Sequence, residues 1–67
     1  MAALASGLQI LKAFDAEHSR VTLTEMAGLT DMDRAKARRF LLTLESLGYV
    51  RRDGRYFELT PRVLELG

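Results

Sequence analysis

The chain has 67 residues, of which 48% are hydrophobic and 28% charged, a composition typical of one small globular domain. It contains no cysteine, which excludes disulfides and thiolate metal sites and fits a cytoplasmic location. No apolar run approaches the roughly 18 residues that a membrane-spanning helix needs. The net charge of +1 hides an uneven distribution: residues 1–33 carry −3, residues 34–55 carry +5, and residues 56–67 carry −1. We expect the middle block to meet a negatively charged partner.

Residues 3–14 are predicted to form a helix with a wide apolar surface. Two adjoining apolar stripes consist of Leu4, Leu8 and Leu11, and of Ala3, Ile10 and Phe14. The polar residues expected on the other side are Ser6, Gln9 and Lys12. The apolar surface spans roughly 160°, which is more than one small core usually needs. The pattern therefore leaves two alternatives, a well-buried first helix or a helix that partly meets a second copy of the chain.

A loop at residues 15–20 and a short strand at residues 21–23 are expected next. Thr24 is a good N-cap for a short helix over residues 25–29, with Glu25 favourably placed in its first turn. The residues of this helix predicted to face the core are Met26, Ala27 and Leu29. Asp31 follows at a turn and can adopt the left-handed conformation there. Ala27 is the small residue where the two flanking helices must approach closely.

A long helix is predicted from the N-cap Asp33 to about Leu47, with Gly48 just beyond its end. The apolar residues expected to fill the core are Ala37, Phe40, Leu41, Leu44 and Leu47. Residues 34–39 hold four cations and no acid. A helix with one apolar and one cationic face, set behind a short helix and a tight turn, suits the major groove of DNA. Leu42 lies on the cationic side, and the sequence leaves open whether it packs on the hairpin, on a partner, or beyond the DNA contact.

Two β-rich runs, residues 49–52 and 55–59, flank Asp53-Gly54 and predict a hairpin with a two-residue turn. Phe57 and Leu59 are expected on its core face. Thr60 and Pro61 predict the N-cap and first residue of a final helix. The apolar residues of that helix are Val63, Leu64 and Leu66. The order of elements predicts a mainly α fold with a small β-hairpin, a winged helix-turn-helix, over residues 1–60, with residues 61–67 starting a linker helix.

The candidate DNA-binding residues of the long helix divide by their position around it. Arg38 and Arg39 lie on the side away from the core, and a guanidinium can bond guanine O6 and N7 together. Ala35 is small enough to approach a thymine methyl group. Arg34 and Lys36 lie on the flanks and suit phosphates, which supply affinity without sequence information.

Further candidates surround the hairpin turn and the start of the short helix. Arg51, Arg52 and Arg55 are expected to follow the DNA backbone or enter a minor groove. The alternative is a charged edge strand that resists aggregation. Thr24, and more weakly Thr22, are candidates to help the first amides of the short helix hold a phosphate.

The sequence offers no arrangement suited to catalysis or to a metal. His18 is the only histidine and has no second ligand or nucleophile nearby. The carboxylates are scattered, and the glycines form no phosphate-cradling loop. We therefore expect neither an enzyme nor a metal or other cofactor.

Four segments are distributed over nearly the whole chain, between residues 6 and 67: SGLQILKAF, TLTEMA, RAKARRFLLTLESLGYV and RRDGRYFELTPRVLELG. They resemble the DNA-binding domain of IclR-type transcriptional regulators. The form RAxARRFLLTL looks most like the branch that controls aromatic-acid catabolism, in the protocatechuate and 4-hydroxybenzoate pathways. Family members commonly have glycine where Asp31 stands and often proline where Asp33 stands.

The resemblance implies a homodimer whose first and linker helices contribute to pairing. It also implies a separate C-terminal domain through which a small-molecule effector would act. We expect sequence-specific binding to an inverted-repeat operator in double-stranded DNA, with no membrane partner. The alternative is a protein-interaction or dimerisation module that keeps the winged fold but uses only the apolar faces of its first and last helices.

Overall fold

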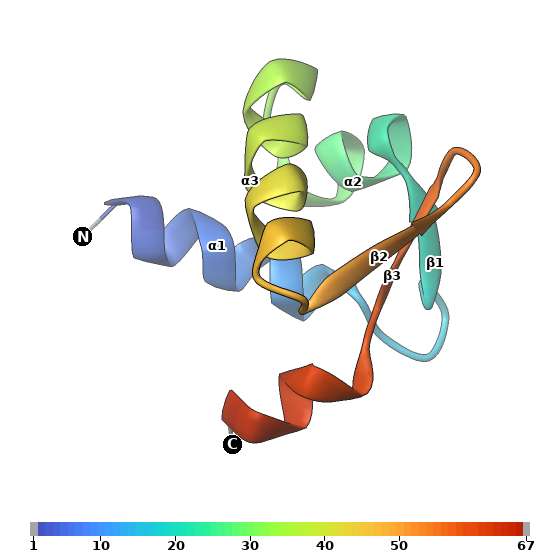
Figure 1. Cartoon of the computed structure of the whole chain (residues 1–67). Helices are drawn as coiled ribbons and strands as arrows, with labels where there is room; N and C mark the ends of the chain where they lie inside the picture. Colours follow the sequence, from blue (N-terminus) through green and yellow to red (C-terminus); the bar gives the residue numbers. More distant parts are fainter. Residues whose placement is uncertain (1, 67) are drawn as a thin grey trace.

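The computed structural model describes residues 2–66, whose helices and strands follow the predicted order (Figure 1). The elements are α1 (Ala2–Ala13), β1 (Arg20–Thr22), α2 (Leu23–Thr30), α3 (Arg34–Ser46), β2 (Val50–Asp53), β3 (Tyr56–Leu59) and the 3-10 helix η1 (Pro61–Leu66). The winged helix-turn-helix expected from the sequence is therefore confirmed. No helix within residues 2–66 is both long enough and apolar enough to cross a bilayer.

The three strands form one antiparallel sheet in the order β1-β3-β2. Val21 in β1 lies opposite Phe57, and Val50 in β2 lies opposite Leu59. Because Phe57 and Leu59 are two positions apart, these apolar pairs share the face that packs against the helices. The hairpin of β2 and β3 extends away from this core, and its turn lies at the far end from η1 (Figure 1).

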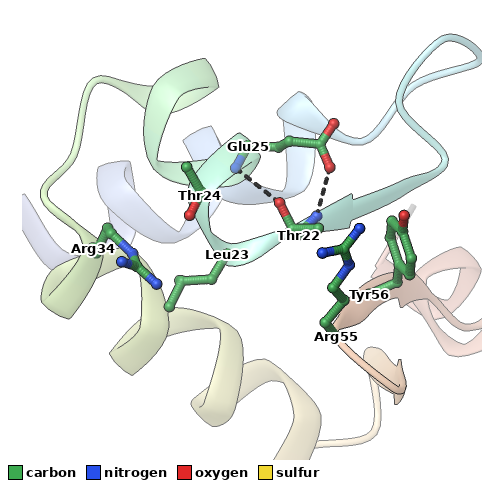
Figure 2. A pocket seen from close by; sticks show the side chains of 7 residues that line it. All are labelled: Thr22, Leu23, Thr24, Glu25, Arg34, Arg55 and Tyr56. Atoms are coloured by element: carbon green, nitrogen blue, oxygen red, sulfur yellow. Dashed lines mark hydrogen bonds between the residues drawn. The ribbon is translucent and has the colours of Figure 1, made fainter.

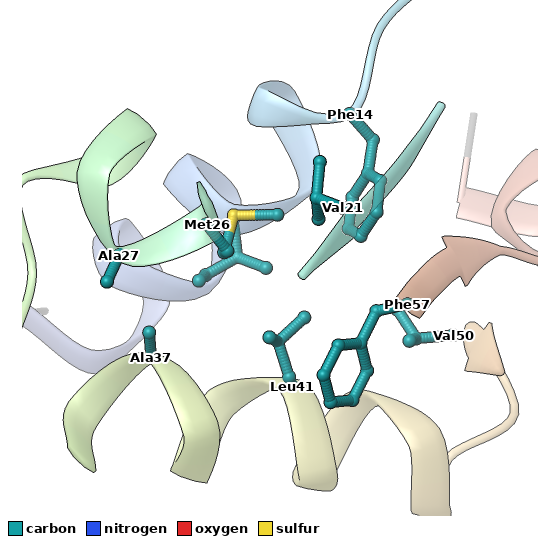
Figure 3. Close-up of a cluster of buried hydrophobic side chains, with 9 residues drawn as sticks. Phe14, Val21, Met26, Ala27, Ala37, Leu41, Val50 and Phe57 are labelled. Carbon is teal, nitrogen blue, oxygen red and sulfur yellow. The ribbon is translucent and has the colours of Figure 1, made fainter. Parts of the chain in front are cut away.

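One hydrophobic core joins every described element except η1 (Figure 3). Its buried members are Ile10, Phe14, Val21, Met26, Ala27, Ala37, Leu41, Val50 and Phe57. Leu41 of α3 and Met26 of α2 are fully buried within it. Close packing of α3 against α2 and against the sheet consequently fixes its orientation.

The buried face of α1 differs from the predicted one. Ile10 and Phe14 are buried together with Ser6, which was wrongly placed on the polar side. These residues are spaced by four and form one stripe along the helix. Leu4 and Leu8 are 64% and 48% exposed. Within a single chain, the leucine stripe of α1 is therefore not part of the core.

The start of α2 also differs from the prediction, because Thr22 is the N-cap instead of Thr24. The hydroxyl oxygen of Thr22 accepts the N–H of Glu25 at 3.2 Å, and the Glu25 carboxylate accepts the N–H of Thr22 at 2.9 Å. This reciprocal pair satisfies two backbone donors at once. A cap at Thr24 would place Ala27 three residues later, where no side chain could close the pair. The strand before it is correspondingly shifted to Arg20–Thr22.

The turn between α2 and α3 adopts the predicted geometry. Asp31 has φ 56° and ψ 33°, and its N–H bonds the carbonyl oxygen of Ala27. Asp33 caps α3 by accepting the N–H of Lys36 at 2.8 Å. Its φ of −70° is one that proline also adopts. The two aspartates therefore supply the conformations for which glycine and proline are suited, and the turn is kept.

Two leucines predicted to face the core are exposed instead. Leu29 is 44% exposed, and Thr30 takes the buried position, donating its hydroxyl proton to the carbonyl oxygen of Met26 at 2.7 Å. Leu47 is 52% exposed because it follows the last turn of α3 as its C-cap. The other residues predicted for the core face of α3 are either buried or packed against the core: Ala37, Phe40, Leu41 and Leu44.

The hairpin turn is displaced by one residue from the predicted Asp53-Gly54. Asp53 pairs with Tyr56 in the sheet, so the two loop residues are Gly54 and Arg55. Gly54 has φ +63°, a conformation that glycine adopts without strain. Asp53 stays in the strand, where its carboxylate accepts a hydrogen bond from Arg20 at 2.8 Å.

The final helix begins at Pro61 as predicted, but it is a 3-10 helix and not an α-helix. Thr60 connects it to the end of α3 by donating its hydroxyl proton to the carbonyl oxygen of Gly48 at 2.6 Å. Val63 is half-buried and Leu64 is 78% exposed. The side chain of Leu66 and residue Gly67 lie outside the described part of the chain.

The capping arrangement predicts different consequences for two neighbouring threonines. Thr22→Ala should lower the free energy of unfolding by about 1 kcal/mol, because the backbone N–H of Glu25 loses the hydroxyl oxygen that accepts it. Thr24→Ala should change it by less than about 0.5 kcal/mol, because Thr24 is exposed in the first turn. Urea unfolding followed by circular dichroism measures both. Equal losses in the two variants would contradict the assignment of the cap.

Candidate nucleic-acid interface

The angle between α2 and α3 is set where two alanines face each other (Figure 3). Ala27 is 7% exposed and Ala37 is fully buried. Such small side chains let the two helices approach closely, and a larger residue at either position would push α3 away. Because Ala37 and Leu41 face the core, the opposite side of α3 faces outward.

The outward side of α3 carries two arginines on either side of an apolar line. Ala35 and Leu42 are seven residues apart and fall on one line along the helix, with Arg38 and Arg39 flanking it. Arg38, Arg39 and Ala35 are exposed, and Leu42 is half-buried. A shallow hollow on this side is lined by Ala35, Arg38, Arg39, Leu42, Thr43 and Ser46. All six belong to α3, so Leu42 borders a hollow formed by this helix alone.

Ion pairs divide the cations of the basic block into two groups. In residues 2–66, those without a carboxylate within 4.0 Å are Arg34, Lys36, Arg38, Arg39 and Arg55. Arg51 is paired with Glu58 at 2.7 Å, and Arg52 with Glu45 at 3.2 Å. The positive charge that is not locally compensated is therefore concentrated on α3 and at the hairpin turn.

Arg52 contacts two different elements. Its guanidinium lies 5.8 Å from the centre of the Phe57 ring and donates a hydrogen bond to Glu45 of α3. Arg51 pairs with the carboxylate opposite it on β3. The Arg52–Glu45 pair holds the hairpin against α3, whereas the Arg51–Glu58 pair joins β2 to β3; each exposed ion pair contributes only about 0–1 kcal/mol.

Arg20 of β1 is a further cation beside the hairpin turn, and no local pattern in the sequence indicates it. Its guanidinium donates to Asp53 at 2.8 Å and lies 4.8 Å from the centre of the Tyr56 ring. Arg55 lies 5.5 Å from the same ring. Arg20 offsets the negative charge of Asp53 beside the hairpin turn. Its partner is 33 residues away in the sequence, and the pair forms only because β1 and β2 both align with β3.

A second hollow lies where α2, α3 and the hairpin turn meet (Figure 2). Its lining residues are Thr22, Leu23, Thr24, Glu25, Arg34, Arg55 and Tyr56. Arg34 and Arg55 enter it from opposite sides in the view of Figure 2. Thr24 is exposed here, whereas the N–H and hydroxyl oxygen of Thr22 are engaged with Glu25.

Glu25 carries a negative charge in this hollow at neutral pH. The backbone N–H of Thr22, followed by its side chain, lowers the pKa of Glu25 from its ordinary value of 4.5. The start of α2 therefore already holds an anionic group of the protein itself. The positive charge in this hollow comes from Arg34 and Arg55, whereas the first amides of α2 face the capping pair of Thr22 and Glu25.

This arrangement is matched by known proteins. Residues 3–54 match the family described as the IclR helix-turn-helix domain. The chain belongs to the IclR family. It is a helix-turn-helix DNA-binding domain of transcriptional regulators and not an enzyme, in agreement with the sequence prediction.

Two curated relatives come from Acinetobacter baylyi. The IclR domain is 48% identical over 65 residues to the Pca operon regulatory protein, covering 97% of this chain and 23% of the relative. It is 47% identical over 64 residues to the p-hydroxybenzoate hydroxylase transcriptional activator, covering 96% and 24%. The chain thus spans about a quarter of the length of these relatives.

A solved structure of a transcriptional regulator from Rhodococcus sp. RHA1 superposes on the whole IclR domain. The TM-score is 0.97 at 57% sequence identity, and the match covers 100% of this chain and 27% of the other. The backbone of the α2-turn-α3 unit and of the hairpin is therefore shared with an experimentally determined relative.

The capping carboxylate predicts part of the acid sensitivity of the IclR domain. A carboxyl group whose pKa is lower in the folded state stabilises the fold above its unfolded pKa, and this contribution is lost as the pH falls. Glu25→Gln should therefore flatten the decline in unfolding free energy between about pH 6 and about pH 3. Urea titrations at several pH values give the two profiles. Parallel profiles for the variant and the parent would contradict this origin of the effect.

Proposed function

We propose that this domain reads a specific sequence in double-stranded DNA with the outward side of α3 in the major groove. The observation that carries the proposal concerns the cations of residues 34–55 that have no ion-pair partner in the described chain. Apart from Arg55 at the hairpin turn, they gather on one exposed helix behind a short helix and a tight turn. Four of them follow one another within residues 34–39. This is the arrangement in which a recognition helix presents its first turns to base edges.

The position of each outward-facing side chain of α3 determines which part of the DNA we expect it to contact. Arg38 and Arg39 project on either side of the outward line and suit bidentate bonds to guanine. Ala35 between them permits close approach. Arg34 and Lys36 lie toward the flanks, where DNA phosphates pass.

The hairpin and the start of α2 add contacts to the DNA backbone in this proposal. Arg55 and Thr24 reach a phosphate beside Arg34, with Thr22 holding the first turn of α2 in place. Arg51 and Arg52 add long-range attraction for the DNA, and their ion pairs keep the hairpin in place. The hairpin then follows the DNA backbone or enters a minor groove. In this proposal the paired hairpin residues Arg51 and Arg52 contribute less to sequence specificity than the arginines of α3.

We further propose that the domain acts as half of a homodimer on an inverted repeat. The exposed Leu4 and Leu8 of α1 and Leu64 of η1 provide apolar surface for pairing with a second copy. Residues 61–67 would begin the linker to a C-terminal domain that binds a small-molecule effector, which accords with relatives about four times as long. Such a regulator acts in the bacterial cytoplasm, on the nucleoid.

The genes under its control are proposed to belong to aromatic-acid catabolism. The two relatives are named as regulators of a Pca operon and of p-hydroxybenzoate hydroxylase. Both are about half identical to this chain across almost all of its length.

Selection of bound sequences from random duplexes by the full-length protein, repeated over a range of salt concentrations, tests the DNA-reading proposal. An enriched inverted repeat is expected. The logarithm of affinity should fall with the logarithm of salt concentration by roughly 0.9 for each phosphate neutralised. Self-association without duplex binding at low salt would instead favour a pure interaction module, to which the exposed leucines of α1 and η1 would then belong.

The two groups of arginines predict two kinds of binding defect. Arg39→Ala should weaken binding to the selected site by roughly 1–3 kcal/mol and relax the base preference at one position. Arg52→Ala should weaken binding evenly across sequences, because Arg52 is paired with Glu45 and attracts the DNA only at long range, without reading bases. Competition titrations with single-base variants of the site measure both effects.

Lys12→Ala is a matched control, since it removes a cation from α1 outside the α3 surface. It should leave base preference unchanged. Equal discrimination by the parent and by Arg39→Ala would remove Arg39 from the base-reading role.

A further inference from the structure

We propose that Leu42 determines specificity by packing against the C5-methyl group of thymine. Together with Ala35 it forms an apolar line between Arg38 and Arg39, so that the bound sequence carries thymine next to guanine. This inference rests on the proposed DNA-reading function and names the base that part of its surface selects.

The position of Leu42 separates it from the leucines of the core. Leu41 is fully buried and Leu44 packs against the core. Leu42 belongs to neither group among the described residues, and it lies in the hollow lined by α3 alone. It follows Ala35 by seven residues, which is two helical turns or about 10.5 Å along the helix. The two apolar groups therefore sit at opposite ends of the stretch that carries Arg38 and Arg39.

The floor of this hollow is less polar than its composition indicates. The hydroxyl of Thr43 donates to the carbonyl oxygen of Arg39 at 2.9 Å, and the hydroxyl of Ser46 donates to that of Thr43 at 2.8 Å. Both hydroxyl protons are thus directed into the backbone of α3. The surface between the two guanidinium groups offers mainly carbon atoms, and covering it with a methyl group removes apolar area from water.

The flanking charges identify what covers this apolar line. A protein partner seated on it would have to bury or pair Arg38 and Arg39, both of which lack carboxylate partners in the described chain. The DNA major groove can both bond the two arginines and cover the apolar line, since guanine presents two acceptors and thymine presents the methyl group. Charge complementarity therefore favours thymine methyl groups as the occupant.

Replacing thymine by uracil in the duplex tests the proposal, because it removes only the methyl group and keeps base pairing. Duplexes from the selection experiment are compared with copies in which deoxyuridine replaces single thymines adjacent to the guanine positions. The parent protein should lose about fourfold in affinity at one such position for the methyl group removed. Leu42→Ala should bind the thymine and uracil duplexes equally, and alanine maintains the helix.

Leu47→Ala is the matched control, because it truncates an exposed leucine beyond the last turn of α3. It should keep the fourfold preference for thymine. The comparison of thymine with uracil in the parent protein does not depend on how any variant folds.

Three results would overturn the inference: no thymine next to guanine in the selected sequence, no loss with uracil, or the same loss in Leu42→Ala as in the parent. An enriched operator with any of these results would leave the proposed function intact. Absence of any enriched sequence would instead refute the proposed function itself, and with it this assignment of Leu42.

Discussion

The contact between Ala27 and Ala37 is the constraint on which the rest of this surface depends. Both side chains are buried, and the helices that carry them are joined by a turn whose Asp31 has a positive φ. Close approach here fixes which side of α3 faces the core, and thereby which side faces outward. The basic side chains of α3 form no ion pair with another described side chain. Their direction follows from the packing of the opposite face.

The charge distribution of this small domain depends on which cations are paired with carboxylates as well as on how many cations there are. The hairpin arginines Arg51 and Arg52 are compensated by carboxylates from β3 and α3, and Arg20 compensates Asp53 near the turn. The arginines of α3 are left without such partners in residues 2–66. A net charge of +1 therefore coexists with a strongly positive helix. In the proposed complex, long-range attraction comes from the whole basic block, whereas directed bonds to bases come from the unpaired groups on α3.

The sequence was sufficient for the order of elements, the ends of α3 and the left-handed turn at Asp31, because these depend on local signals. The N-cap of α2 was predicted too late in the chain because Thr22 and Thr24 are each good caps alone. Only the reciprocal hydrogen bonds between Thr22 and Glu25 distinguish them. Leu29 and Ser6 were assigned to the wrong sides of their helices because a short amphipathic helix does not reveal which of two adjoining stripes its neighbours cover. The pairing of Arg52 with Glu45 requires the hairpin to fold back onto α3, which no local pattern encodes.

The leucines of α1 and Leu42 of α3 are apolar groups outside the core of residues 2–66, and their surroundings differ. The leucines of α1 lie on a helix whose one described cation is Lys12, near its end. Leu42 lies between two arginines that have no carboxylate nearby in the described chain. A second protein copy can cover the first surface without burying unpaired charge, but it cannot cover the second without supplying acids. DNA supplies acceptors and methyl groups together in one groove. The proposed division of the domain into a pairing side and a DNA-reading side thus rests on where its arginines lie relative to its leucines.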